Sequence, residues 1–190
     1  PCINHFREPI KMRSYASNFW ALGADGVYIF NYAGEPVGSE KHECLKQIGD
    51  PDSLKRLDKL YEPVQGGGPV YIGYNSRPPQ FPVRLVADIP IELMVGDDLA
   101  KAAQQGVLKE VRLHVKVANM ELVEGITIKI NGTPVDARVI HRVDLETFEA
   151  VVTTSPLRLG INKIVILPGL NSVARLSSTV NWVELSVDYR

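Results

Sequence analysis

The spacing of apolar side chains changes once along this 190-residue chain, and the change divides it into two kinds of structure. Up to about residue 62 the apolar positions recur at helical spacing, whereas beyond residue 80 they alternate with polar positions in short runs. Alternation with a period of two places one side of a strand in a core and the other in water. The sequence therefore predicts an α/β segment followed by a mainly β region.

Six to eight short strands are predicted in the second part of the chain. The clearest of them are residues 111–117, 126–130, 148–153, 163–167 and 183–189, with one or two more within 83–95. Asn131-Gly132 follows one strand directly and favours a tight hairpin turn. Short strands separated by turns are typical of a sandwich or a jelly roll. The predicted fold class is therefore mainly β, with a C-terminal antiparallel β-sandwich.

Residues 8–22 predict an amphipathic helix, with Pro9 in its first turn and Gly23 just past its end. The run 27–32 that follows is apolar on both sides, which indicates a buried strand of a parallel sheet. A second helix is predicted over 40–49, and Asp50-Pro51 predicts the start of a third. The apolar side of that third helix is expected to consist of Leu54, Leu57, Leu60 and Tyr61.

A lone strand between helices cannot satisfy its backbone groups or bury both of its faces. The first part is therefore interpreted as a helix–strand–helix remnant of an α/β domain. Three consecutive glycines and a proline within residues 66–80 are typical of a linker. The predicted organisation is an α/β unit over 1–65, the linker over 66–80 and the β-sandwich over 81–190.

Two segments resemble known families. Residues 14–32 carry Asn18-Phe19-Trp20 and then Ala24-Asp25-Gly26 before an aromatic strand, and they resemble the last helix–strand unit of bacterial glycoside-hydrolase-like (β/α)8 barrels. This resemblance extends over about residues 6–62, with 57–61 resembling part of the closing helix of a TIM-like barrel. Residues 126–132 and 159–166 are similar to strands of galactose-binding-like jelly-roll domains.

The resemblance implies the C-terminal part of a bacterial glycoside-hydrolase-like protein, with an appended galactose-binding-like jelly roll. The sandwich is then expected to support the barrel or to bind carbohydrate. Barrel strands one to seven, on which the catalytic carboxylates of such glycosidases usually lie, are missing. The resemblance therefore assigns no catalytic residue to this chain, and whether the parent protein is an enzyme stays open. The alternative is a purely structural or adhesion sandwich that binds no sugar.

Binding partners and a cellular location are also expected. The apolar faces of residues 10–32 require a cover, which the sandwich, a missing upstream barrel domain or a second copy of the chain could supply. Pro1 without an initiator Met favours a removed leader or domain upstream. An extracytoplasmic location, whether periplasmic, cell-surface or secreted, is favoured for such proteins.

Four residues are candidate carbohydrate contacts. Asn31, Tyr32 and Glu35 follow the predicted strand at its C-terminal end, where barrel active sites form. Glycosidic cleavage needs two carboxyl groups, and Glu35 has no identifiable partner, so no catalytic residue is assigned. Trp182 falls on the polar side of the last strand, where it either stacks on a sugar or is covered by a neighbouring domain or loop.

Composition and spacing argue against several other functions. The formal net charge of −1 gives no electrostatic reason to expect nucleic acid, and no apolar run approaches the ~20 residues of a membrane span. Asp97-Asp98 could contribute to a calcium site, but a helix cap is the favoured interpretation. Cys2 and Cys44 are expected to be free thiols, with one disulfide between them as the alternative, and no metal site or cofactor is predicted.

Overall fold

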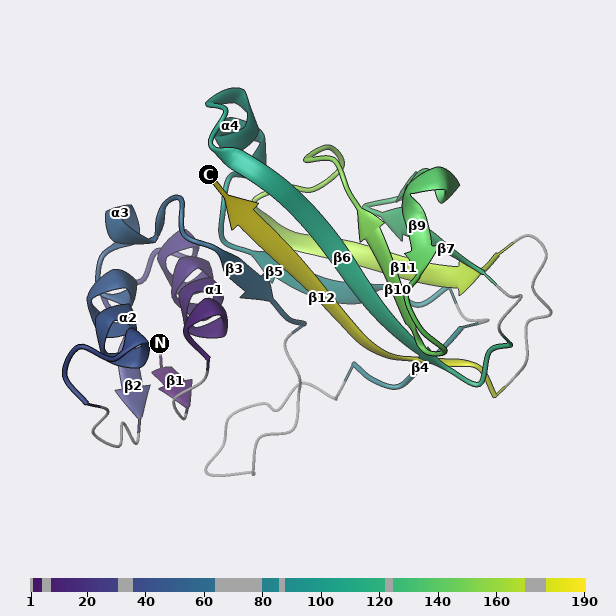
Figure 1. Cartoon of the computed structure of the whole chain (residues 1–190), viewed down its shortest axis with the longest axis horizontal. Helices are drawn as coiled ribbons and strands as arrows, with labels where there is room; N and C mark the ends of the chain where they lie inside the picture. Colours follow the sequence, from purple (N-terminus) through teal and green to yellow (C-terminus); the bar gives the residue numbers. More distant parts are fainter. Residues whose placement is uncertain are drawn as a thin grey trace.

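The computed structural model describes residues 2–4, 8–30, 36–63, 80–85, 88–121, 125–169 and 177–190. It is mainly β, with antiparallel sheets and few helices, an arrangement consistent with a β-sandwich (Figure 1). Within these ranges, no helix combines the length and apolarity that crossing a membrane requires. The two larger antiparallel sheets are called the sandwich below.

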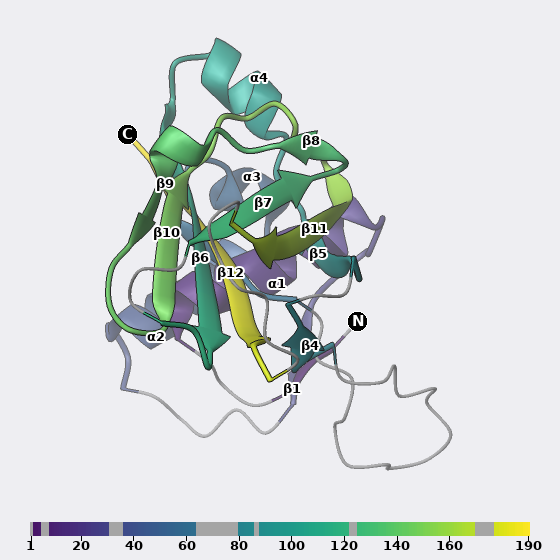
Figure 2. The same cartoon turned by 90° about the vertical axis from the view of Figure 1, so that its right-hand side faces the viewer.

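The larger sheet has six strands, in the order β3-β12-β6-β10-β9, with β4 also paired to β12. The strands are β3 (Lys59–Tyr61), β4 (Val83–Arg84), β6 (Leu108–Ala118), β9 (Ile140–Arg142), β10 (Thr147–Val151) and β12 (Thr179–Tyr189). The smaller sheet has the order β5-β11-β7-β8. Its strands are β5 (Ile91–Val95), β7 (Ile126–Ile130), β8 (Thr133–Pro134) and β11 (Gly160–Pro168). Figure 2 shows β7 and β11 crossing the direction of β6, β10 and β12.

The main core lies between these two sheets, and it is built from the apolar positions of the alternating runs. Leu113 of β6 and Leu185 of β12 are paired and fully buried, and they belong to the same cluster as Ile128 and Ile164 of the other sheet. The predicted strands are therefore confirmed. The predicted hairpin is confirmed as well, because Asn131 and Gly132 both have positive φ between β7 and β8, as a two-residue turn requires.

The N-terminal part contains two short parallel strands and three helices. They are β1 (Cys2–Asn4), α1 (Pro9–Ala21), β2 (Tyr28–Phe30), α2 (Glu40–Ile48) and α3 (Pro51–Leu54). The two remaining helices of the described chain are α4 (Leu99–Gln104) and a short 3-10 helix (Ala137–Val139). The predicted helices over 8–22 and 40–49 are confirmed. The apolar face of α1 packs into a second core with Ile3, Cys44 and Ile48.

The prediction of a helix beyond Asp50 is right about its start and wrong about its length, which is shorter than expected. Asp50 caps it as expected, but α3 ends at Leu54, and β3 pairs with β12 instead of continuing a helix. Arg56 has a φ of 67°, a left-handed conformation that a helix cannot contain. Leu60 and Tyr61, assigned to the helix by their spacing, therefore belong to an antiparallel sheet.

The strand predicted within 27–32 is present as β2 but is not buried on both sides. The side chain of Tyr28 is 62% exposed among the described residues. The strand also has a partner that the sequence did not indicate, because β1 pairs with it in parallel. The chain thus forms a β–α–β unit, β1-α1-β2, rather than a lone strand.

Helix α1 lies along the side of the sandwich where β3 and β5 are the outermost strands of their sheets (Figure 1). The hydroxyl of Ser14 donates to the carbonyl of Leu60 at 2.6 Å, which attaches the helix to β3. On β5, the side-chain amide of Gln80 forms a pair of hydrogen bonds with the backbone N–H and C=O of Glu92. These contacts satisfy backbone groups that the two sheets leave unpaired.

Candidate functional site

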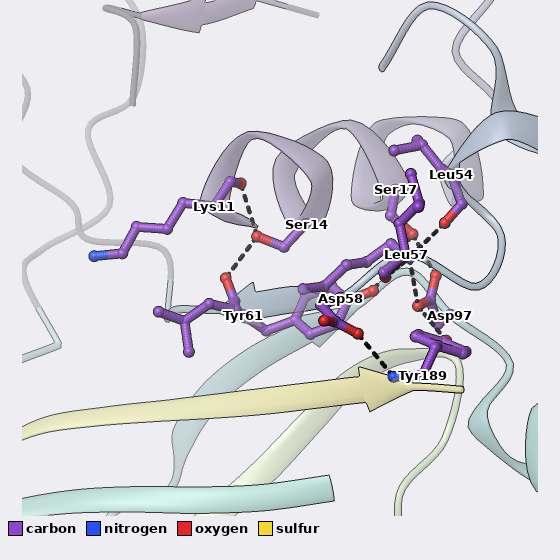
Figure 3. A network of polar contacts seen from close by, with 11 residues as sticks. Lys11, Ser14, Ser17, Leu54, Leu57, Asp58, Tyr61, Asp97 and Tyr189 are labelled. Carbon is purple, nitrogen blue, oxygen red and sulfur yellow. Dashed lines mark hydrogen bonds and ion pairs between the residues drawn. The ribbon is translucent and has the colours of Figure 1, made fainter. Parts of the chain in front are cut away.

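A polar network lies where α1, β3, the segment after β5 and the end of β12 meet (Figure 3). Its members, called the junction network below, are Ser17, Lys59, Tyr61, Asp97 and Tyr189. They come from four parts of the chain, and the fold alone brings them together. The network connects the β–α–β unit to the sandwich.

Asp97 is the centre of the junction network. One carboxylate oxygen accepts a hydrogen bond from the hydroxyl of Ser17 at 2.7 Å. The other accepts from the hydroxyl of Tyr189 at 2.6 Å and lies 3.0 Å from the ammonium of Lys59. The Asp97 side chain is only 12% exposed, so the ion pair is largely shielded from water.

Lys59 is fully buried, and its ammonium uses its three N–H groups. It donates to the carbonyls of Leu54 at 2.7 Å and Leu57 at 2.9 Å, and it faces Asp97. It also lies 5.0 Å from the centre of the Tyr189 ring. Burial lowers the pKa of Lys59 below its ordinary value, and the charge of Asp97 offsets part of that effect. An enclosed amine with three acceptors is suited to holding structure, not to accepting a proton from a substrate.

The two tyrosines of the junction network stay neutral. Burial and the nearby Asp97 carboxylate raise the pKa of Tyr61 and of Tyr189 above the ordinary value for a phenol. Tyr61 donates to the Ser17 hydroxyl at 3.4 Å, and Tyr189 donates to Asp97. The network therefore contains one cation, one anion and three neutral hydroxyls, all of them engaged.

One face of α1 forms polar contacts with the side of the sandwich. Lys11, Ser14 and Ser17 are spaced by three residues, and they bond to Glu62, to the Leu60 carbonyl and to Asp97. The Lys11–Glu62 ion pair measures 2.6 Å. This face was not identified from the sequence, because two serines among charged residues resemble a solvated surface.

A cavity of about 470 Å³ opens beside the junction network. Trp20 of α1, Arg56, Asp98 and Lys101 contribute to its wall, together with Asp97 and Tyr189. Asp98 caps α4 through a 3.0 Å hydrogen bond from the Lys101 backbone N–H, so the predicted helix cap is confirmed for this residue. Asp97 is instead directed to the junction network, which the sequence did not predict.

Of the four candidate carbohydrate contacts, only Trp182 lies within the described residues. Asn31, Tyr32 and Glu35 lie outside the described residues. Trp182 is half-buried on β12, where its ring centre lies 5.7 Å from that of Phe81. Its indole N–H donates to the carboxylate of Glu184 at 3.1 Å. The Trp182 ring is therefore partly covered by a neighbouring segment.

Candidate metal ligands and thiols in the described ranges are as follows. No group of three or more His, Cys, Asp or Glu side chains there could hold a metal ion. Cys44 is a free, buried thiol, and burial raises its pKa to about 11. The Cys2 side chain lies outside the described part of the chain.

Comparison with protein-family models and with curated protein sequences gives no match for this chain. The class of molecule is therefore defined by its own structure. It is a mainly β protein with antiparallel sheets, in which a parallel β–α–β unit is attached to one side of the sandwich.

Proposed function

We propose that the chain is the C-terminal, non-catalytic part of a bacterial glycoside-hydrolase-like protein, in which a jelly-roll sandwich supports an α/β barrel. The observation that carries this proposal is a small β–α–β unit whose helix α1 is hydrogen-bonded, through Ser17, to the buried Lys59–Asp97 ion pair of the sandwich. The sequence resemblance supplies the family, and the junction network favours a supporting role over a separate binding module.

The β1-α1-β2 unit has the character of a fragment of a larger parallel sheet. Each of its strands has three residues, and among the described residues neither pairs with any strand but the other. Parallel sheets are normally covered on both faces and contain more strands. Leu22 and Tyr28 are 71% and 62% exposed in this unit. Further parallel strands on either side of β1 and β2, as in a barrel, would cover such surfaces.

The arrangement of the unit is also consistent with the expected location of a substrate site. The carboxyl ends of β1 and β2 lie at one edge because the strands are parallel. Asn31, Tyr32 and Glu35 follow β2 directly in the sequence. In a barrel, this is the end at which substrates bind. In this proposal they contribute to a subsite, and the catalytic carboxylates belong to other strands.

The junction supports a mechanical role for the sandwich. Lys59 lies on β3, a strand of the larger sheet, and Asp97 directly follows β5 of the smaller sheet. Ser17 connects both to α1. A helix held simultaneously by both sheets has little freedom to move relative to them, so the sandwich fixes the position of the β–α–β unit.

The family and the size of the parent protein can be tested with an antiserum raised against the 190-residue chain. In the cells that produce it, the antiserum should detect a polypeptide larger than 21.0 kDa, in a periplasmic, surface or secreted fraction. It should also deplete a polysaccharide-hydrolysing activity, and pre-immune serum should not. A single 21 kDa species, with hydrolase activity left intact, would contradict the proposal.

The alternative role, a carbohydrate-binding module, depends on Trp182. If the sandwich is a support, Trp182→Ala should leave retention of the chain in polysaccharide-containing gels unchanged. It should lower the free energy of unfolding by about 1–2 kcal/mol, because the ring contact with Phe81 and the hydrogen bond to Glu184 are lost. Phe81→Ala is the matched control and should cost a similar amount. Retention that Trp182→Ala abolishes and Phe81→Ala preserves would favour the binding module.

A further inference from the structure

We propose that the cavity beside the junction network is a binding site for a small polyhydroxy acid, of which a hexuronate is the simplest example. This site goes beyond the proposed function, because it lies at the C-terminal end of α1. The carboxyl ends of β1 and β2 lie at the other end of the β–α–β unit, since α1 runs back between the two parallel strands.

The size and construction of the cavity suit a ligand of this kind. Its volume of about 470 Å³ falls in the range of small-molecule pockets, roughly 300–1,000 Å³. Its walls come from α1, the segment after α3, α4 and the end of β12. Asp97 binds Ser17 of α1, Tyr189 of β12 and Lys59, and Lys59 binds the Leu54 carbonyl of α3, so the walls are in place before a ligand arrives.

Two cations at the cavity have no acidic partner among the described residues. The Lys55 ammonium is paired with Asp52, and the Asp97 carboxylate is paired with Lys59. Arg56 and Lys101 line the same cavity and form no such pair within the described ranges. An arginine and a lysine from two different segments of one cavity wall favour a carboxylate, which a guanidinium binds with two parallel hydrogen bonds.

The backbone of Arg56 provides a second observation. Its φ of 67° is a left-handed conformation that is unfavourable for a side chain other than glycine, asparagine or aspartate. Backbone strain of this kind is concentrated at binding sites, where surrounding contacts hold it. The left-handed backbone of Arg56 sets the direction of its Cα–Cβ bond at the cavity wall.

The remaining wall residues fit hydroxyl groups and a ring face. Trp20 and Tyr189 supply aromatic surface, and the Trp20 indole is fixed by a 3.0 Å hydrogen bond from its N–H to the Ile48 carbonyl. Asp98 and Gln105 supply acceptors for hydroxyl hydrogens. One carboxylate, several hydroxyls and one apolar ring face together describe a sugar acid.

Titration calorimetry on the full 190-residue chain tests the site, with glucuronate and galacturonate as the probes. Saturable binding of either probe is expected, with glucose bound at least tenfold more weakly because it lacks the carboxylate. Arg56→Gly combined with Lys101→Gln should weaken binding of the acid at least tenfold. Glycine relieves the left-handed strain at residue 56, so this variant should melt no lower than the parent chain.

Lys55→Gln is the matched control, because Lys55 lines the same cavity but is already paired with Asp52. It should change affinity less than twofold. The proposal would be overturned by an absence of saturable binding, by equal affinity for glucose, or by undiminished affinity in the Arg56→Gly/Lys101→Gln variant. None of these outcomes depends on whether the parent protein is a glycoside hydrolase.

Discussion

Replacing Asp97 with alanine is expected to lower the free energy of unfolding by about 3–5 kcal/mol, as for other buried ion pairs that lose one partner. The substitution leaves the fully buried ammonium of Lys59 without its counter-charge. It also removes the acceptor for Ser17 and Tyr189. Urea unfolding followed by circular dichroism at neutral pH measures the effect.

Two further variants separate the charge effect from other losses. Lys59→Met in the Asp97→Ala background removes the stranded cation, so the double variant should be more stable than Asp97→Ala alone. Asp98→Ala is the matched control at the neighbouring position, and it removes only a helix cap, at a cost of about 1 kcal/mol. If Asp97→Ala and Asp98→Ala cost the same, the buried ion pair does not hold the junction.

Gly96→Ala is expected to cost about 3 kcal/mol, the upper end for overpacking a core. A Cβ at this position would lie 2.5 Å from the backbone nitrogen of Asn18 and still closer to the carbonyl carbon of Ser17. Both contacts are with the backbone of α1, which cannot rotate away as a side chain can. The helix and the end of β5 must therefore separate to accept one methyl group.

Gly125→Ala is the matched control, because a Cβ there meets nothing within 4 Å. It should change the free energy of unfolding by less than about 0.5 kcal/mol. Hydrogen exchange provides the second measurement, since a displaced α1 should lose amide protection while β6 and β12 retain theirs. Full protection of α1 in Gly96→Ala would mean that the close approach at Gly96 is not required.

The strands of the sandwich could be predicted from the sequence because each carries its own signal. In β6, Val111, Leu113 and Val115 alternate with Arg112 and His114, and the structure buries the first set in the core. Helix α1 was predictable for the same reason, since its apolar positions share one face. Local periodicity is sufficient wherever an element packs through a regular face.

Elements that depend on distant partners could not be predicted in this way. Leu57, Leu60 and Tyr61 have helical spacing, yet residues 59–61 are a strand because β12 offers an edge more than 120 residues later in the sequence. Strand β1 has three residues, and its partner β2 lies beyond an entire helix. In both cases tertiary pairing outweighs local propensity.

The candidate site was even less visible in the sequence. Asp97 is separated from Ser17 by 80 positions and from Tyr189 by 92, so no motif connects them. A buried lysine also contradicts the usual assignment of this residue type to a wet surface. The sequence offers one clue, the pair Asp97-Asp98. Asp98 alone is sufficient to cap α4, so Asp97 is available for another role.

The two hydrogen bonds between the Gln80 side chain and the Glu92 backbone affect how the chain aggregates at high concentration. An exposed edge strand presents unpaired N–H and C=O groups, and identical molecules can pair with them and aggregate. Gln80 binds such groups on β5 with its own side chain, and α1 shields β3 in the same region. Helix α1 on β3 and Gln80 on β5 thus protect two sheet edges from self-association, and a shortened chain that starts after α1 would lose that protection on β3.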